Sequence, residues 1–194
     1  MAVIVSNPIC IIKGASQFLN KKMIMKKETK IPLSIAVVQQ VTNNTTSWIG
    51  RRTRENEGIV SGQTFIASTE GDLDAIHIFS SIVTRPGKVT MTFYNFDQYE
   101  KLWGAVLGSA SLDFNHNETG KWIAFNFTGL HLNKGLAYGF RLESPDTYIG
   151  LGEATGTYKI PPFVSGQEWK FSNINKLGNS YSYFSLAFKV DLRA

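Results

Sequence analysis

Residues 121–143 read KWIAFNFTGLHLNKGLAYGFRLE, and this stretch decides the class of fold that the sequence predicts. On both sides of a short polar segment the side chains alternate with a period of two, which is typical of β-strands. Gly129 and the segment Asn133-Lys134-Gly135 supply residues that turns prefer. We therefore expect two strands, 122–127 and 136–143, that pair with each other as a β-hairpin.

Because neighbouring residues of a strand point to opposite faces, the alternation also predicts which side chains face the core. Asn126 is expected to point away from the core. Six apolar side chains of the hairpin are expected on its inner face: Ile123, Phe125, Phe127, Leu136, Tyr138 and Phe140.

The same alternation recurs along most of the chain, separated by turn-forming residues. The further strands expected are 31–41, 63–67, 73–79, 88–96, 105–112, 148–151, 167–171 and 183–192. Residues 43–47 are expected to form a polar loop, and no segment has a convincing helical period. This pattern predicts an all-β fold, an antiparallel β-sandwich of the jelly-roll type spanning residues 31–194, after an irregular N-terminal extension.

The charge of the chain is concentrated at its N-terminus. Residues 1–30 contain six Lys and one Glu, so the 20 basic and 15 acidic side chains of the chain leave 14 of each for residues 31–194. A neutral domain has no net field to attract a phosphate backbone, so we do not expect it to bind nucleic acid.

Residues 1–30 are interpreted as a basic tail or as a degenerate targeting segment. The segment that starts at Met25 has the basic-then-apolar order of an export signal, but its apolar run is short. A flexible tail and a short amphipathic helix are the alternatives. We expect an exported or cell-surface protein, with a cytoplasmic protein as the alternative, and no membrane-spanning helix, because no run of about 18 apolar residues occurs. Cys10 is the only cysteine, which excludes an intrachain disulfide.

Several short motifs give residues 33–192 a resemblance to a known class of domain. They are Gly62-Gln63-Thr64-Phe65, Gly71-x-Leu73 with Ile76, Val89-Thr90-Met91-Thr92-Phe93-Tyr94, Trp122-x-x-Phe125-x-Phe127, Leu132-x-x-Gly135-x-x-Tyr138 and Leu186-Ala187-Phe188-Lys189-Val190. The pattern resembles jelly-roll domains of bacterial exported and surface proteins, which are related in architecture to carbohydrate-binding modules and galactose-binding-like domains. The resemblance implies a binding or adhesive role and export. Turn glycines and core aromatics specify fold more than function.

No constellation typical of catalysis occurs, so we do not expect an enzyme. The three histidines lack metalloprotease spacing, and neither a Gly-x-Ser-x-Gly motif nor a phosphate-binding loop is present. Two carboxylate pairs, Asp72 with Asp74 and Asp113 with Glu118, are weighed for glycoside hydrolysis, which needs two acids about 5–10 Å apart. Solvated turns explain both pairs better.

The best metal candidate is the segment that holds Asp113, Asn115 and Glu118, because clustered hard oxygen ligands suit calcium. Ordinary loop chemistry, which favours the same residues, is the alternative, and no other cofactor is expected.

Four aromatic residues near loops are the candidate ligand-binding residues: Trp48, Tyr99, Trp103 and Trp169. Flat aromatic rings stack on the apolar faces of sugars, so these residues favour a non-catalytic module that binds a glycan or another cell-surface component. The alternative for Trp103 is a ring folded back over the end of the sandwich. The alternative function is a structural or assembly subunit of a surface or particle structure, in which the basic tail contacts a partner.

Overall fold

The computed structural model describes residues 34–51 and 58–193, which belong to one compact unit. The N-terminal tail and most of the charged segment 51–57 lie outside the described residues. Alternating apolar side chains give the described part fourteen strands and one turn of 3-10 helix. The elements are β1 (Ser34–Gln40), β2 (Thr45–Arg51), β3 (Gly58–Ile66), β4 (Gly71–Arg85), β5 (Gly87–Asp97), β6 (Leu102–Phe114), η1 (His116–Glu118), β7 (Lys121–Asn126), β8 (His131–Leu132), β9 (Ala137–Glu143), β10 (Tyr148–Thr155), β11 (Glu168–Ser172), β12 (Asn179–Tyr181), β13 (Phe184–Leu186) and β14 (Phe188–Arg193).

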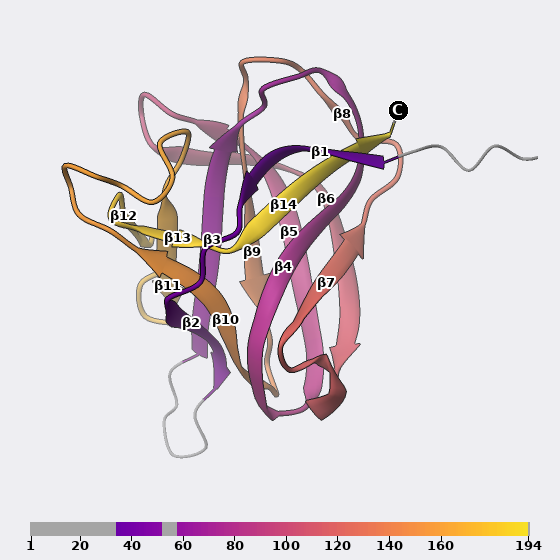
Figure 1. Ribbon diagram of the computed structural model, residues 1–194, viewed down its shortest axis with the longest axis vertical. Coiled ribbons are helices and arrows are strands. Elements are labelled where there is room, and N and C mark those ends of the chain that lie inside the picture. The colour runs from indigo at the N-terminus through magenta and orange to yellow at the C-terminus, as the bar shows by residue number, and fades with distance from the viewer. Residues whose placement is uncertain (1–33, 52–57, 194) are drawn as a thin grey trace, which may run out of the picture. The chain divides into compact units, whose positions relative to one another are not determined.

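These strands form one curled antiparallel sheet, and the all-β expectation is confirmed (Figure 1). The main path of the sheet runs β1-β14-β4-β10-β2-β3-β9-β5-β6, while β7 and β8 pair with β4 and β11 pairs with β3. All strand pairs are antiparallel. In Figure 1 the strands β1, β14 and β4 cross in front of β9, β5 and β6.

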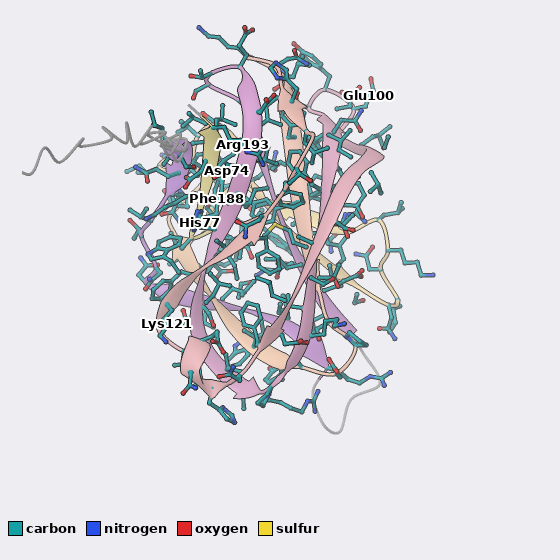
Figure 2. The ribbon with its side chains drawn as sticks, turned by 90° about the vertical axis from the view of Figure 1, so that its right-hand side faces the viewer. Asp74, His77, Glu100, Lys121, Phe188 and Arg193 are labelled. Carbon is teal, nitrogen blue, oxygen red and sulfur yellow. The ribbon has the colours of Figure 1, made fainter. Side chains whose placement is uncertain are left out.

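The core lies inside the curl, where rings from distant strands meet. Phe188 of β14 lies 6.0 Å from Phe65 of β3 and 5.7 Å from Phe140 of β9, measured between ring centroids. Phe93 of β5 lies 5.9 Å from Phe127, the residue that follows β7. Figure 2 shows side chains, Phe188 among them, packed between the strands. The two halves of the curled sheet therefore share one hydrophobic interior.

The expected hairpin is wrong, although most of its faces are right. Strand β7 pairs with β4, where Phe125 lies opposite Ile76, and β9 pairs with β3 and β5. The short strand β8, in the connection between them, also pairs with β4 and holds the chain there. A connection of this length does not force its two flanking strands to pair, so the longer ladders available on β3, β4 and β5 decide the pairing.

Four of the six predicted inner-face side chains, those of Phe125, Phe127, Tyr138 and Phe140, are buried, and Ile123 packs against the core as a partly buried side chain. Leu136 is the error, because its side chain is 53% exposed. It precedes β9, and its amide donates a hydrogen bond to the carbonyl of Asn133, three residues earlier, at 3.2 Å. Leu136 therefore closes a turn rather than continuing the alternation of the strand.

The predicted polar loop 43–47 is wrong from Thr45 onward, because β2 begins there. Ser47 is buried opposite Leu151 of β10, and Ile49 is buried in the core. Threonine and serine suit turns, but they also fit the pleated surface of a strand when another strand lies beside them.

Candidate functional site

The outer face of the strands β11, β3, β9, β5 and β6, which neighbour one another in that order, carries the most distinctive set of side chains. Alternation along β9 sends Phe140 and Leu142 to the core, so Arg141 and Glu143 point outward. The ladders place Arg141 opposite Gly62 of β3 on one side and opposite Thr92 of β5 on the other. The nearest neighbours of Arg141 across the sheet therefore come from β3 and β5.

Five rings from β5, β6 and β11 pack on this outer face, and we call them the outer aromatic cluster: Tyr94, Phe96, Trp103, Trp169 and Phe171. Trp103 is its centre. Its ring centroid lies 5.5 Å from that of Tyr94, 5.4 Å from that of Phe96, 5.7 Å from that of Trp169 and 5.5 Å from that of Phe171. All four contacts are edge-to-face, the geometry that aromatic quadrupoles prefer.

Two glycines make room for these rings directly on the sheet. A Cβ at Gly139 would lie 2.7 Å from Trp103, and a Cβ at Gly62 would lie 3.2 Å from both Trp103 and Phe171. The first distance is shorter than van der Waals contact, so any larger residue would push the Trp103 ring off the strand. The bare backbone at these two positions lets a polar outer face hold a partly buried aromatic layer.

The guanidinium of Arg141 lies inside this layer. Its Cζ is 4.1 Å from the ring centroid of Phe171, 4.3 Å from that of Trp103 and 5.0 Å from that of Tyr94. Cation–π contacts of this kind stabilise a cation whose hydration is reduced. Burial lowers the pKa of Arg141, while Tyr94 and Glu143 act in the opposite direction. Its Nε is buried and has no hydrogen-bond partner.

An open groove of about 620 Å³ lies beside Arg141. The rings of Tyr94 and Phe171 form part of its lining, together with the first residues of β3. Its polar lining includes Thr90, Thr92, Arg141, Glu143, Ser144 and Lys176. The groove therefore combines apolar ring surface, hydroxyl groups and charges of both signs, which is the composition of a site for a polar ligand that also has apolar faces.

The four predicted ligand-binding aromatics lie in three different places. Trp103 and Trp169 meet in the outer aromatic cluster, where Trp169 is only 5% exposed and offers no free face to a ligand. Trp48 of β2 stacks on Tyr148 of β10 with ring centroids 4.6 Å apart. Tyr99, in the turn between β5 and β6, is 87% exposed and lines a smaller hollow of about 370 Å³.

The residues that line the groove were missed at the sequence level. Arg141 sits between buried Phe140 and Leu142, and a charged residue at this place in the alternation is the sequence signal that its side chain points outward. Nothing in the sequence indicates that Trp103 and Phe171 meet over Gly139 and Gly62, because that contact depends on the pairing of β9 with β3 and β5.

Two of the three predicted calcium ligands, Asn115 and Glu118, make hydrogen bonds at the start of η1. The Asn115 side chain accepts a hydrogen bond from the Asn117 amide (2.9 Å), and the Glu118 carboxylate accepts one from the Asn115 amide (2.8 Å). These bonds form the capping box of η1, and Asp113 is exposed at the end of β6. Within the described residues, no group of three or more His, Cys, Asp or Glu side chains is arranged to hold a metal. The capping box is the loop chemistry named as the alternative, and the calcium site stays a prediction.

The two carboxylates of the pair Asp72 and Asp74 contact different partners on the surface. Asp72 Oδ1 lies 2.8 Å from His131 Nδ1, and Asp74 Oδ1 accepts a hydrogen bond from Arg193 Nε at 3.0 Å. Figure 2 shows Asp74 and Arg193 side by side. Each acid is thus engaged with a different basic partner.

A second group of carboxylates is buried on the inner side of β11. Lys170 Nζ donates hydrogen bonds to Ser47 Oγ at 2.5 Å and to Glu153 Oε1 at 2.7 Å, and it lies 2.5 Å from Glu168 Oε1. The Glu168 side chain is fully buried. Burial is the main cause that raises the pKa of Glu168 to about 8, and the Glu153 charge adds to the effect against the opposing charge of Lys170.

This raised pKa predicts a pH-dependent stability. An acid that binds its proton more tightly in the folded state stabilises the fold below its unfolded pKa, and this stability is lost as the pH rises through the folded pKa. The melting temperature is expected to fall as the pH rises from about 5 to about 8. Glu168→Gln, which mimics the neutral acid, should make the melting temperature depend less on pH in this range. Thermal unfolding followed by circular dichroism at several pH values measures it.

Glu100→Gln is the matched control, because Glu100 lies exposed in the turn between β5 and β6 (Figure 2). Its melting temperature should depend on pH as that of the parent protein does. A Glu168→Gln protein that keeps the full pH dependence would contradict the assignment of the titration to Glu168.

Comparison of the sequence with models of known protein families finds no match, and comparison with curated protein sequences finds none either. Among the described residues, no helix is long and apolar enough to cross a membrane.

Proposed function

We propose that this chain is a non-catalytic binding module that takes a glycan into the groove beside Arg141. The observation that carries the proposal is the lining of that groove, in which the Tyr94 and Phe171 rings lie beside hydroxyl and charged groups. Sugars present apolar faces of C–H groups and rims of hydroxyls, so a site for them needs ring surface next to hydrogen-bonding groups. We propose that the module acts at a cell surface.

The proposal includes a jelly-roll sandwich as the architecture. Its support is the contact of rings across the interior, from β14 and β7 on one half of the curled sheet to β3, β9 and β5 on the other. In a sandwich of this kind the outer faces are available for ligands while the inner faces form the core.

The non-catalytic role is supported by the charges at the groove. Glu143 is the carboxylate among the described residues that line it, and hydrolysis of a glycoside by the usual route requires two. The buried pair Glu153 and Glu168 lines no part of this groove and is engaged with Lys170.

Affinity gel electrophoresis of the protein in gels that contain neutral or acidic polysaccharides tests the proposal. Retardation by at least one polysaccharide is expected, and Tyr94→Ala should remove it, because that ring belongs to the groove lining. Stacking of a nucleic-acid base on one aromatic side chain is worth on the order of 1–3 kcal/mol. The same magnitude for a sugar on Tyr94 corresponds to at least about a fivefold loss of affinity.

Tyr99→Ala is the matched control, because Tyr99 is exposed but does not line the groove. It should leave the retardation unchanged. Loss of retardation in Tyr99→Ala with full retention in Tyr94→Ala would move the site to the β5–β6 turn and contradict the proposal.

A further inference from the structure

The Arg141 guanidinium has no acceptor among the described residues 34–51 and 58–193. A guanidinium carries five N–H donors, but the side chain of Arg141 makes no hydrogen bond or ion pair with any described residue. The surrounding rings interact with its charge but provide no acceptor oxygen. Because its Nε alone is both buried and unpaired, its two terminal nitrogens keep contact with solvent at the groove.

The other charged residues among the described lining of the groove, Glu143 and Lys176, do not form an ion pair with Arg141. Glu143 lies two residues away on the same face of β9 and raises the pKa of Arg141, yet it does not approach the guanidinium closely enough to form an ion pair. Lys176, in the segment after β11, adds a second positive charge to the lining. The described lining therefore carries one formal positive charge in excess.

From this arrangement we infer that the ligand carries a carboxylate and that Arg141 binds it through its terminal nitrogens, which makes the ligand an acidic, uronate-containing glycan. The inference rests on the proposed function and specifies the ligand class of that same groove. The planar fork of arginine matches a carboxylate in two parallel hydrogen bonds. A partly desolvated guanidinium whose buried Nε has no acceptor is costly, and an incoming carboxylate offsets that cost.

The remaining lining suits the rest of a uronate residue. Glu143 accepts hydrogen bonds from sugar hydroxyls, and the Thr92 hydroxyl both donates and accepts them. The Thr90 hydroxyl, which is bonded to Ser111 Oγ at 2.8 Å, keeps an acceptor position for the ligand. The Tyr94 ring provides an apolar surface for the C–H face of the pyranose. A free carboxylate alone would leave these groups unused, so the groove favours a sugar acid over a small organic acid.

Matched probes separate the contribution of the carboxylate from that of the sugar. The probes are oligomers of galacturonate, mannuronate and glucuronate, each as the free acid and as the methyl ester, which keeps the sugar but removes the charge. Polyglutamate serves as a carboxylate-rich polymer without sugar. Isothermal titration calorimetry measures the dissociation constants with the parent protein and with Arg141→Gln, Arg141→Lys and Arg193→Gln.

At least one uronate is expected to bind about 10- to 100-fold more tightly as the acid than as its ester, the range of one charge-assisted pair. Arg141→Gln should lose a similar factor for the acid and leave affinity for the ester unchanged. Arg141→Lys keeps the charge without the fork and should fall between the two. Arg193→Gln removes an arginine that pairs with Asp74 outside the groove, and it should bind as the parent does.

The other outcomes overturn the inference in distinguishable ways. Equal binding of acid and ester, or full binding of the acid by both Arg141 variants, would refute the role of the carboxylate and of Arg141 while leaving a glycan-binding groove. Binding of polyglutamate as tight as that of the uronates would refute the glycan assignment. Binding of neither acids nor esters, nor of any neutral polysaccharide, would refute the proposed function as well. Thermal unfolding identifies any variant that is not folded, and Arg141→Lys then carries the test.

Discussion

Replacing Phe125 with alanine is expected to destabilise the folded domain by about 3–5 kcal/mol, the usual cost of truncating a buried phenylalanine. Its side chain is fully buried, with its ring centroid 6.2 Å from that of Phe114 and its backbone opposite Ile76 of β4. Small domains are stable by only about 5–15 kcal/mol, so this single change removes a large share. Urea unfolding measures it, as a lower midpoint at an unchanged slope.

Asn126→Ala is the matched control, because Asn126 is the next residue of β7 and its side chain is exposed. We expect a change within about 0.5 kcal/mol, as for most surface positions. Equal losses in the two variants would contradict the face assignment of β7, which was predicted from the alternation and is the basis of the core described above.

The second large effect is expected at Gly50, where two constraints act together. Gly50 has φ +94°, and a Cβ there would lie 2.0 Å from the carbonyl oxygen of Thr147. A left-handed conformation costs a residue with a Cβ roughly 1–2 kcal/mol, and forced displacement of a packed neighbour adds about 1–3 kcal/mol. Gly50→Ala is therefore expected to lose roughly 2–5 kcal/mol and to loosen the pairing of β2 with β10.

Gly120→Ala separates these two constraints. Gly120 also has a positive φ, +72°, but no atom lies within 4 Å of the position of its Cβ. It should lose only the conformational part, about 1–2 kcal/mol. If the two alanine variants lose the same stability in urea unfolding, the close contact with Thr147 plays no part.

Local patterns predicted the strands better than their partners. The period of two is a property of each strand alone, so it correctly assigned Phe125 and Phe140 to the core. The choice of partner is a property of the whole sheet, and the turn residues at 129 and 133–135 suggested a hairpin that β8 and β4 prevent. The strand β2 was missed because its Thr and Ser residues become strand residues only beside β10.

None of the four predicted ligand-binding aromatic residues is among the described residues that line the groove. Two of them, Trp103 and Trp169, pack against Phe171, whose ring does line the groove. Arg141 could not be found in this way, because its significance comes from rings that β6 and β11 bring over Gly139 and Gly62. A local sequence pattern does not indicate which strands, far apart in the chain, pair with each other.

The central claim is that the groove beside Arg141 is the ligand site. A nitrogen–proton NMR titration of the protein with uronate oligomers and with neutral glycans tests this claim most directly. We predict saturable shifts of the Arg141 Nε–H signal and of the amides of Thr92 and Tyr94, with the signals of Tyr99 and Leu136 unchanged. Saturable shifts confined to Tyr99 and Leu136, or none at any glycan concentration, would contradict it.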